Sequence, residues 1–294
     1  MTIKIAHLGP AGTNAEAAAQ TYQEWLQRDS EATVELLPCQ SIAQSLYALA
    51  HDEVDRAVIP VENSIQGSVA ISLDLVWELH PLSICQQIIL PIHHALISFA
   101  QDFSEIKEVR SHPQALAQCQ RWLEKHLPHA ALREANSTTA VLSNLKDNPH
   151  LGAIAAPRAA HLYHLPIMVD AIGDFPQNCT RFWVLGKEIQ TAGDVISLAF
   201  TLPAKIPGVL VSALEVFARR KINLSRIESR PTKRSLGEYL FFVDIDGCLT
   251  NPDVQAALME LQTHTEILKI LGNYRTIPLV SLGATPAPVT DSSS

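Results

Sequence analysis

The sequence predicts an α/β first part followed by a small βαββαβ domain. Through about the first 185 residues, short β-rich runs alternate with helical patterns, which is typical of mainly parallel sheets. After residue 194 the pattern changes to strand, helix, two strands, helix and strand, the split ferredoxin-like plan. The length of 294 residues suits two domains of roughly 100–200 residues each.

Nine strands are predicted in the first part. They lie at residues 3–9, 33–39, 56–62, 82–90, 108–111, 131–135, 151–157, 167–173 and 181–186. Helices fall between them, one after Ser41 as N-cap and one starting at Pro113, a favourable first helical position. Because nine strands are many for one compact unit, we expect two linked lobes with a cleft.

The second part begins with the alternating run "VISLAFTLP", a half-buried strand. Pro207 and Gly208 open a helix, and Asn251 caps a second helix that starts at Pro252. We therefore predict a first domain over residues 1–188 and a separate small domain over 195–276. The tail, 277–294, is rich in Pro and Ser and is expected to be disordered.

Composition and charge exclude several classes of partner. The chain is 47% hydrophobic and 18% charged, as globular proteins are, and its formal net charge is -8. That charge argues against nucleic acid and anionic membranes as partners. It does not exclude a small anionic substrate, because screening confines each charge to roughly 8 Å at physiological salt.

The cysteines and the N-terminus indicate a cytoplasmic protein. Five cysteines are scattered without a CxxC pair, which favours reduced thiols. Strand-like residues start at once, without a signal-peptide pattern, and no apolar run is long enough for a transmembrane helix.

Four strand-to-helix junctions carry hydroxyl, amide or glycine residues. They are "GPAGTN" (9–14), "ENSIQGS" (62–68), "SHPQA" (111–115) and "NSTTA" (136–140). Helix starts attract anions, and ligands of open α/β sheets lie beyond the carboxyl ends of strands. Any one junction is better explained as a helix cap. The four together, with Arg181, indicate a polar cleft where Thr13 and serine hydroxyls from the other junctions converge.

Other candidate residues are less informative. His112 suits a general acid and a backbone-bonded histidine equally, whereas His93 and His94 are predicted to be structural. Cys179 has no fixed base beside it in the sequence, so a nucleophilic role is not favoured. No carboxylate pair, zinc-ligand spacing or P-loop is identifiable. We therefore expect no metal and no cofactor.

The junction motifs and the stretch around Arg181 resemble those of the prephenate dehydratase family with a C-terminal ACT domain. The resemblance covers about residues 3–276. Its motifs, in family order, are "GPAGT", "VENSIQG", "SHPQALAQC", "NSTTA" and "DFPQNCTRF", followed by "PGVLVSALEVFARRKINLSRIESRP". "NCTRF" and "ESRP", each in its expected place, are highly specific together.

The resemblance implies a carbon–oxygen lyase of phenylalanine biosynthesis that converts prephenate to phenylpyruvate. It also implies two catalytic lobes like a type II periplasmic binding protein, with the substrate between them. The implied catalytic residues are Thr180, Arg181 and Phe182. The implied substrate-binding residues are Asn63, Ser64, Ser111, Gln114, Ser137, Thr138 and Asn178.

The ACT domain implies L-phenylalanine as allosteric effector and a homodimer or homotetramer. The implied effector positions are Gly208, Val209, Leu210 and Val211 in one motif, and Glu228, Ser229, Arg230 and Pro231 in the other. Val209 departs from the usual alanine, and its extra methyls bear on the strength of inhibition.

For the chemistry, we expect Thr180 to hydrogen-bond the departing hydroxyl, Arg181 to pair with a substrate carboxylate and Phe182 to wall the site. Two alternatives stay open. Arogenate dehydratase performs the same reaction on the amino analogue, and a non-catalytic cytosolic sensor of amino or organic acids would suit both domains.

Overall fold

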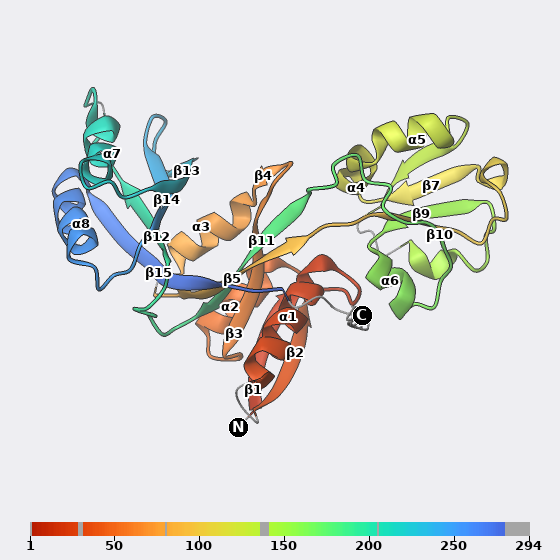
Figure 1. Ribbon diagram of the computed structural model, residues 1–294, viewed down its shortest axis with the longest axis horizontal. Coiled ribbons are helices and arrows are strands. Elements are labelled where there is room, and N and C mark those ends of the chain that lie inside the picture. The colour runs from red at the N-terminus through yellow and green to blue at the C-terminus, as the bar shows by residue number, and fades with distance from the viewer. Residues whose placement is uncertain (1, 29–31, 80, 136–140, 205, 280–294) are drawn as a thin grey trace, which may run out of the picture.

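The computed structural model describes residues 2–28, 32–79, 81–135, 141–204 and 206–279. Figure 1 shows three units in a row: the second lobe, the first lobe and the C-terminal domain. Ser137, Thr138 and residues 280–294 of the predicted tail lie outside the described residues. None of the described helices is long and apolar enough to cross a membrane.

The first lobe is a five-stranded sheet with a short extra strand and flanking helices. Its elements are β1 (Thr2–Leu8), α1 (Asn14–Arg28), β2 (Thr33–Cys39), α2 (Ile42–Ala50), β3 (Arg56–Asn63), β4 (Gly67–Ser68), α3 (Ala70–Glu78), β5 (Ser83–Pro91) and β11 (Cys179–Gly186). The strand order is β5-β11-β3-β1-β2, with β1 parallel to β2 and β3 and β11 antiparallel to both neighbours. The predicted cap is confirmed, because the Ser41 hydroxyl accepts from the backbone N–H of Gln44 at 3.1 Å.

The second lobe is a smaller five-stranded sheet ordered β10-β6-β9-β7-β8. Its elements are β6 (Ala95–Ile97), η1 (Phe103–Glu105), β7 (Glu108–Ser111), α4 (Pro113–Gln118), α5 (Gln120–His126), β8 (Ala131–Glu134), η2 (Leu142–Asn144), β9 (Leu151–Ala155), α6 (Pro157–Leu162) and β10 (Ile167–Val169). The chain crosses between the lobes twice, after β5 and before β11. The two predicted lobes are therefore confirmed.

The helix expected from Pro113 is two helices, α4 and α5, divided at Cys119. Asp174, in the returning crossover, explains the division. Its carboxylate accepts the backbone N–H groups of Arg121 and Trp122 at 2.9 and 3.1 Å. A new helix N-terminus is thereby stabilised in the middle of a continuous apolar pattern.

The C-terminal domain has the predicted βαββαβ order. Its elements are β12 (Val195–Thr201), α7 (Val209–Arg219), β13 (Leu224–Pro231), β14 (Tyr239–Asp246), α8 (Pro252–His264) and β15 (Ile267–Ile277). Helix α7 follows Gly208, whose φ of 80° suits glycine, and Asn251 caps α8 by accepting from Asp253 N–H at 2.8 Å. The helices and one face of the sheet share an apolar core.

This domain is joined to the first lobe more closely than a separate small domain would be. Arg275–Ile277 of β15 pair in parallel with Gln86–Ile88 of β5, so one sheet runs through both. A single apolar cluster also spans them, with Leu73 and Trp183 of the lobe and Phe242 of the domain. The face of the domain's sheet that is not covered by α7 and α8 is therefore buried on the catalytic lobe.

Gly272 permits the close approach of β15 to β5. A Cβ at Gly272 would lie 2.3 Å from the backbone oxygen of Ile84. We predict that Gly272→Ala forces the strands apart and lowers the free energy of unfolding by about 1–3 kcal/mol, the usual cost of overpacking. Thermal denaturation followed by circular dichroism measures this loss. Gly173→Ala is the control, because its Cβ would lie 3.8 Å from the His94 ring, an ordinary van der Waals contact. Equal melting temperatures for both variants would contradict the prediction.

Candidate active site

A cavity of about 850 Å³ lies between the two lobes. It is bordered by the β1–α1 junction, the end of β3, the start of α4 and the start of β11. The carboxyl ends of β1 and β3 therefore face it, as ligand sites in α/β sheets require. Of the predicted catalytic and substrate-binding residues, Asn63, Gln114, Thr180 and Phe182 line this cavity.

Thr180 is held firmly at the cavity wall. It pairs with Asn63 of β3 on one side and Leu90 of β5 on the other. Its Oγ1 accepts a hydrogen bond from Asn63 Nδ2 at 3.0 Å. The amide orientation of Asn63 is fixed, because its Oδ1 accepts two backbone N–H groups at 3.1 Å. Among the described contacts the Thr180 hydroxyl only accepts, so its own proton is available to a ligand.

Asn63 also begins a buried row of hydrogen bonds, here called the amide chain: Asn63, Asn178, Gln118 and His94. Asn63 Nδ2 donates to Asn178 Oδ1 at 2.9 Å, and Asn178 Nδ2 donates to Gln118 Oε1 at 2.9 Å. His94 Nε2 approaches the same Gln118 oxygen at 2.8 Å. All four side chains are buried. The amide chain links the first lobe to the second, so the orientation of the Thr180 side chain depends on how the two lobes contact each other.

Two members of the amide chain were not expected at the site. His94 was predicted to be structural, and Gln118 was not singled out; both line the cavity. The sequence held one signal for Gln118. It follows Gln114 by four residues in α4, so both lie on the same helix face.

Several predicted residues use their polar groups within the protein. Ser64 Oγ accepts the Cys179 N–H at 3.0 Å, and the fully buried Ser111 donates to Ile154 O at 2.6 Å. Neither lines the cavity, whereas Thr13 does. His112 also lines it and accepts from Gln114 N–H at 3.3 Å, so the backbone-bonded alternative is present. The structure therefore brings only some of the expected hydroxyls together.

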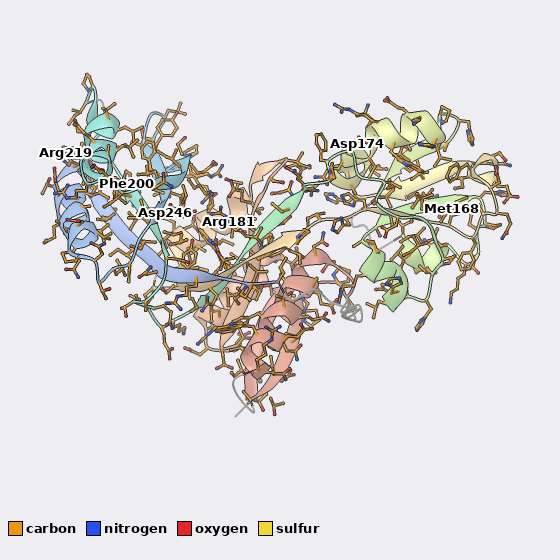
Figure 2. The ribbon with its side chains drawn as sticks, in the orientation of Figure 1. Met168, Asp174, Arg181, Phe200, Arg219 and Asp246 are labelled. Atoms are coloured by element: carbon orange, nitrogen blue, oxygen red, sulfur yellow. The ribbon has the colours of Figure 1, made fainter. Side chains whose placement is uncertain are left out.

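Arg181 points away from the cavity. Successive strand residues face opposite sides of a sheet, so the side chain of Arg181 lies opposite those of Thr180 and Phe182. Its Nη1 contacts Asp244 Oδ2 at 2.8 Å, and its Nε lies 3.5 Å from Glu62 Oε2. Figure 2 shows Arg181 on the side of the C-terminal domain. This geometry does not offer Arg181 to a substrate carboxylate in the cleft.

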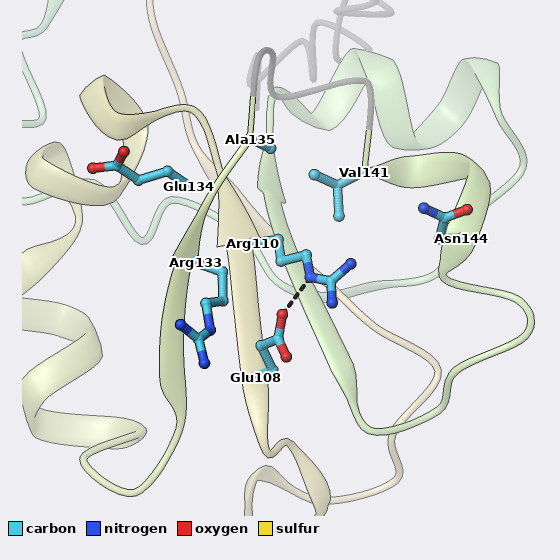
Figure 3. A pocket seen from close by; sticks show the side chains of 7 residues that line it. All are labelled: Glu108, Arg110, Arg133, Glu134, Ala135, Val141 and Asn144. Atoms are coloured by element: carbon cyan, nitrogen blue, oxygen red, sulfur yellow. Dashed lines mark hydrogen bonds and ion pairs between the residues drawn. The ribbon is translucent and has the colours of Figure 1, made fainter.

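A second hollow, of about 480 Å³, lies over β7 and β8 (Figure 3). Arg110 and Arg133 line it with Glu108 and Glu134, and Arg110 is hydrogen-bonded to Glu108. None of the described residues predicted for catalysis or binding borders it. The interlobe cavity is therefore the stronger candidate.

Cross-lobe contacts hold α6 against α1 near the cavity. Arg158 Nη2 donates to Glu16 Oε2 and Gln20 Oε1, both at 2.8 Å, and the Tyr163 hydroxyl donates to Ala11 O at 3.3 Å. Within the described residues, no group of three or more metal-binding side chains is present.

The family profile for prephenate dehydratase matches residues 5–190, which is more than half of the chain. The chain belongs to the prephenate dehydratase family. The expected carbon–oxygen lyase function is thus confirmed, and a second profile, for the ACT domain, matches residues 197–262.

Several prephenate dehydratases are similar to this chain over nearly its whole length. A prephenate dehydratase from Lactococcus lactis is 36% identical over 92% of this chain and 97% of its own length. A bifunctional chorismate mutase/prephenate dehydratase from Aquifex aeolicus is 37% identical, over 92% of this chain and 73% of its own. The crystal structure of an Arthrobacter aurescens prephenate dehydratase in complex with L-Phe is 34% identical, with a TM-score of 0.83 and coverage of 95% and 92%.

The amide chain predicts a dependence of stability on pH. Burial lowers the pKa of His94 from its ordinary 6.5, and no described residue bonds its Nδ1. The unfolded chain therefore takes up a proton near 6.5 while the folded chain resists it, so stability falls as pH drops below that value. We predict that the melting temperature decreases less between pH 7.5 and pH 5.5 in His94→Gln than in the parent.

His7→Gln is the matched comparison for this experiment. His7 is also buried and its pKa is also lowered by burial, so it contributes its own share of the acid sensitivity. An unchanged pH dependence in His94→Gln, with a reduced one in His7→Gln, would assign the effect to His7 alone and contradict the prediction.

Proposed function

We propose that the chain converts prephenate to phenylpyruvate in the interlobe cavity and that L-phenylalanine regulates it through the ACT domain. The observation that carries the catalytic part is the Thr180 hydroxyl, fixed by Asn63 with its proton free toward the cavity. The bond between the ring and its carboxylate breaks, the carboxylate leaves as carbon dioxide, and the electron pair of that bond enters the ring. The ring C–O bond then breaks, and the oxygen leaves as water after gaining a proton.

Thr180 stabilises the leaving oxygen in this proposal. A threonine hydroxyl is too weak an acid to ionise near neutral pH, so it donates a hydrogen bond or relays a proton. The gain in aromaticity drives the fragmentation, and no nucleophile is needed. Phe182, which is almost fully buried, forms an apolar wall beside Thr180 and keeps water from the ring. Beside such an apolar wall a preorganised donor is stronger than it is in open water.

Neutral donors bind the substrate's two carboxylates in this proposal. The described residues that line the cavity include no Lys, Arg, Asp or Glu. Thr13, Asn14 and Ala15 bring the start of the long helix α1 to the cavity, where backbone N–H groups and the helix dipole favour negative charge. Gln114 adds an amide from the second lobe. We also propose Ser137 and Thr138, which lie outside the described residues, as substrate-binding residues.

Arogenate is the second candidate substrate. It has an amino group where prephenate has a keto oxygen. The cavity presents amide groups such as Gln114, and an amide can either donate to a keto oxygen or accept from an ammonium group. A direct comparison of turnover on prephenate and on arogenate therefore decides between the two substrates.

For regulation, the two proposed effector motifs lie at the start of α7 and on β13. Gly208–Val211 include the cap and first residues of α7, and Glu228–Pro231 form the second half of β13. Arg230 also contacts Asp74 of α3 with two hydrogen bonds of 3.2 Å, so this motif touches the catalytic lobe. The Arthrobacter relative, which carries L-Phe, supports phenylalanine as the effector.

We propose a homodimer or homotetramer built on the edge strand β13. This strand pairs only with β14 among the described residues, and Ile227 on it is 47% exposed, with Val211 of α7 at 69%. An open edge bearing apolar side chains favours pairing with another copy. The five free cysteines suit a reducing compartment, and we place the protein in the cytoplasm.

Substitution of Thr180 tests the catalytic proposal. We predict that Thr180→Ala lowers kcat about 10²–10³-fold, the typical effect of losing one preorganised donor. Thr180→Ser keeps the hydroxyl and retains most of the activity. Release of phenylpyruvate from prephenate, and of phenylalanine from arogenate, measures both variants and compares the substrates. A Thr180→Ala enzyme as fast as the parent on both substrates would rule out this role, and a parent without turnover would favour the sensor alternative.

The proposed assembly is tested at β13. We predict that Ile227→Lys shifts the mass measured by light scattering toward the monomer, because a charge in the paired edge must be desolvated. Met259→Lys is the control, since Met259 is also an exposed apolar residue but lies on α8. The interface lies elsewhere if both variants keep the parent's mass.

A further inference from the structure

Two arginines and two carboxylates meet between the first lobe and the C-terminal domain, here called the interdomain cluster: Glu62, Arg181, Arg226 and Asp244. Arg181 binds Asp244 at 2.8 Å, and Glu62 Oε2 lies 3.5 Å from the Nε of both arginines. The side chains of Asp244 and Arg226 are 1% and 5% exposed. Buried charges of this kind are stable only when paired.

Asp244 is fixed on its own side of the cluster. Ser197 donates to its Oδ1, and the Ser197 hydroxyl also lies 2.6 Å from the Tyr274 hydroxyl. These residues belong to β12 and β15, so three strands of the C-terminal domain hold this carboxylate. A shift of that sheet moves the partner of Arg181.

Each lobe residue of the cluster adjoins a residue of the cavity. Glu62 precedes Asn63, and Arg181 precedes Phe182 and follows Thr180. Arg226 Nη2 also donates to Ser68, which itself lines the cavity, at 3.0 Å. On the other side, Arg226 lies two residues before Glu228, the start of the proposed effector motif on β13.

We propose that Arg181, Arg226 and Asp244 are positioning residues that set the geometry of Thr180 and Asn63 and carry the effector signal from β13 to them. This inference rests on the proposed regulation by phenylalanine. Strand β11 presents Thr180 to the substrate and Arg181 to the regulatory sheet, so both act on one short piece of backbone. A small displacement of a catalytic group is enough to slow the reaction.

Asp244→Asn is the direct test, in the full-length protein. The substitution keeps the shape and leaves Arg181 and Arg226 with Glu62 as their only carboxylate in the cluster. We expect kcat on the accepted substrate to fall while KM changes little. Calorimetry should show phenylalanine binding unchanged. The factor by which phenylalanine changes kcat should be smaller than in the parent, where coupling between two sites is typically about 5–150-fold. A purely structural role would lower the melting temperature without this separation of binding from response.

Glu62→Gln is the second variant, because its side chain is 31% exposed and tolerates change better. Glu260→Gln on α8 is the control; it breaks the pairs of Glu260 with Arg219, the last residue of α7, and with Arg220, the latter at 2.7 Å. Parent-like kcat and phenylalanine response in both Asp244→Asn and Glu62→Gln, or equal losses in Glu260→Gln, overturn the proposal. If the parent turns over substrate and phenylalanine does not change its activity, the proposed regulation is refuted instead. The kcat of Asp244→Asn then still decides the positioning role.

Discussion

The alternation of side chains along β11 is the constraint on which the rest of the structure depends. Thr180 and Phe182 face the interlobe cavity, and Arg181 between them faces the C-terminal domain. The strand is paired on both sides, by β3 and β5, so it cannot rotate to exchange these faces. One strand therefore belongs to the catalytic site and to the domain contact at the same time.

This arrangement explains why the C-terminal domain is not an independent attachment. Its sheet continues into the first lobe through β15 and β5, and its open face is buried on α3. Alone, that face would expose Phe242 and Tyr274 and leave Asp244 without its arginine from the lobe. The C-terminal domain alone, residues 195–276, is consequently not suited to measuring effector binding, which should be measured on the intact chain.

Local patterns predicted most of the elements, since caps such as Ser41 and Asn251 act through neighbouring residues. The short strands β4 and β6 were not predicted. Contacts between distant segments were not predictable in the same way. Asp174 divides α4 from α5 from 53 residues away, and no pattern around Cys119 announces it. The motifs predicted that Asn63, Gln114 and Thr180 share one site, and all three line the interlobe cavity. They did not show that Arg181 has a buried partner in Asp244, 63 residues later, which removes it from the cleft.

The absence of lysine and arginine from the described cavity wall fits the proposed chemistry. A cation held against the ring carboxylate would stabilise the ground-state dianion most, and that charge is lost as carbon dioxide leaves. Neutral donors such as the Thr180 hydroxyl and the α1 amides favour the negative charge wherever it moves, including the departing oxygen. The amide chain orients Asn63, and through it the Thr180 hydroxyl, while Gln118 of the second lobe stays hydrogen-bonded to both Asn178 and His94. The orientation of the Thr180 hydroxyl is thus tied to the contact between the two lobes.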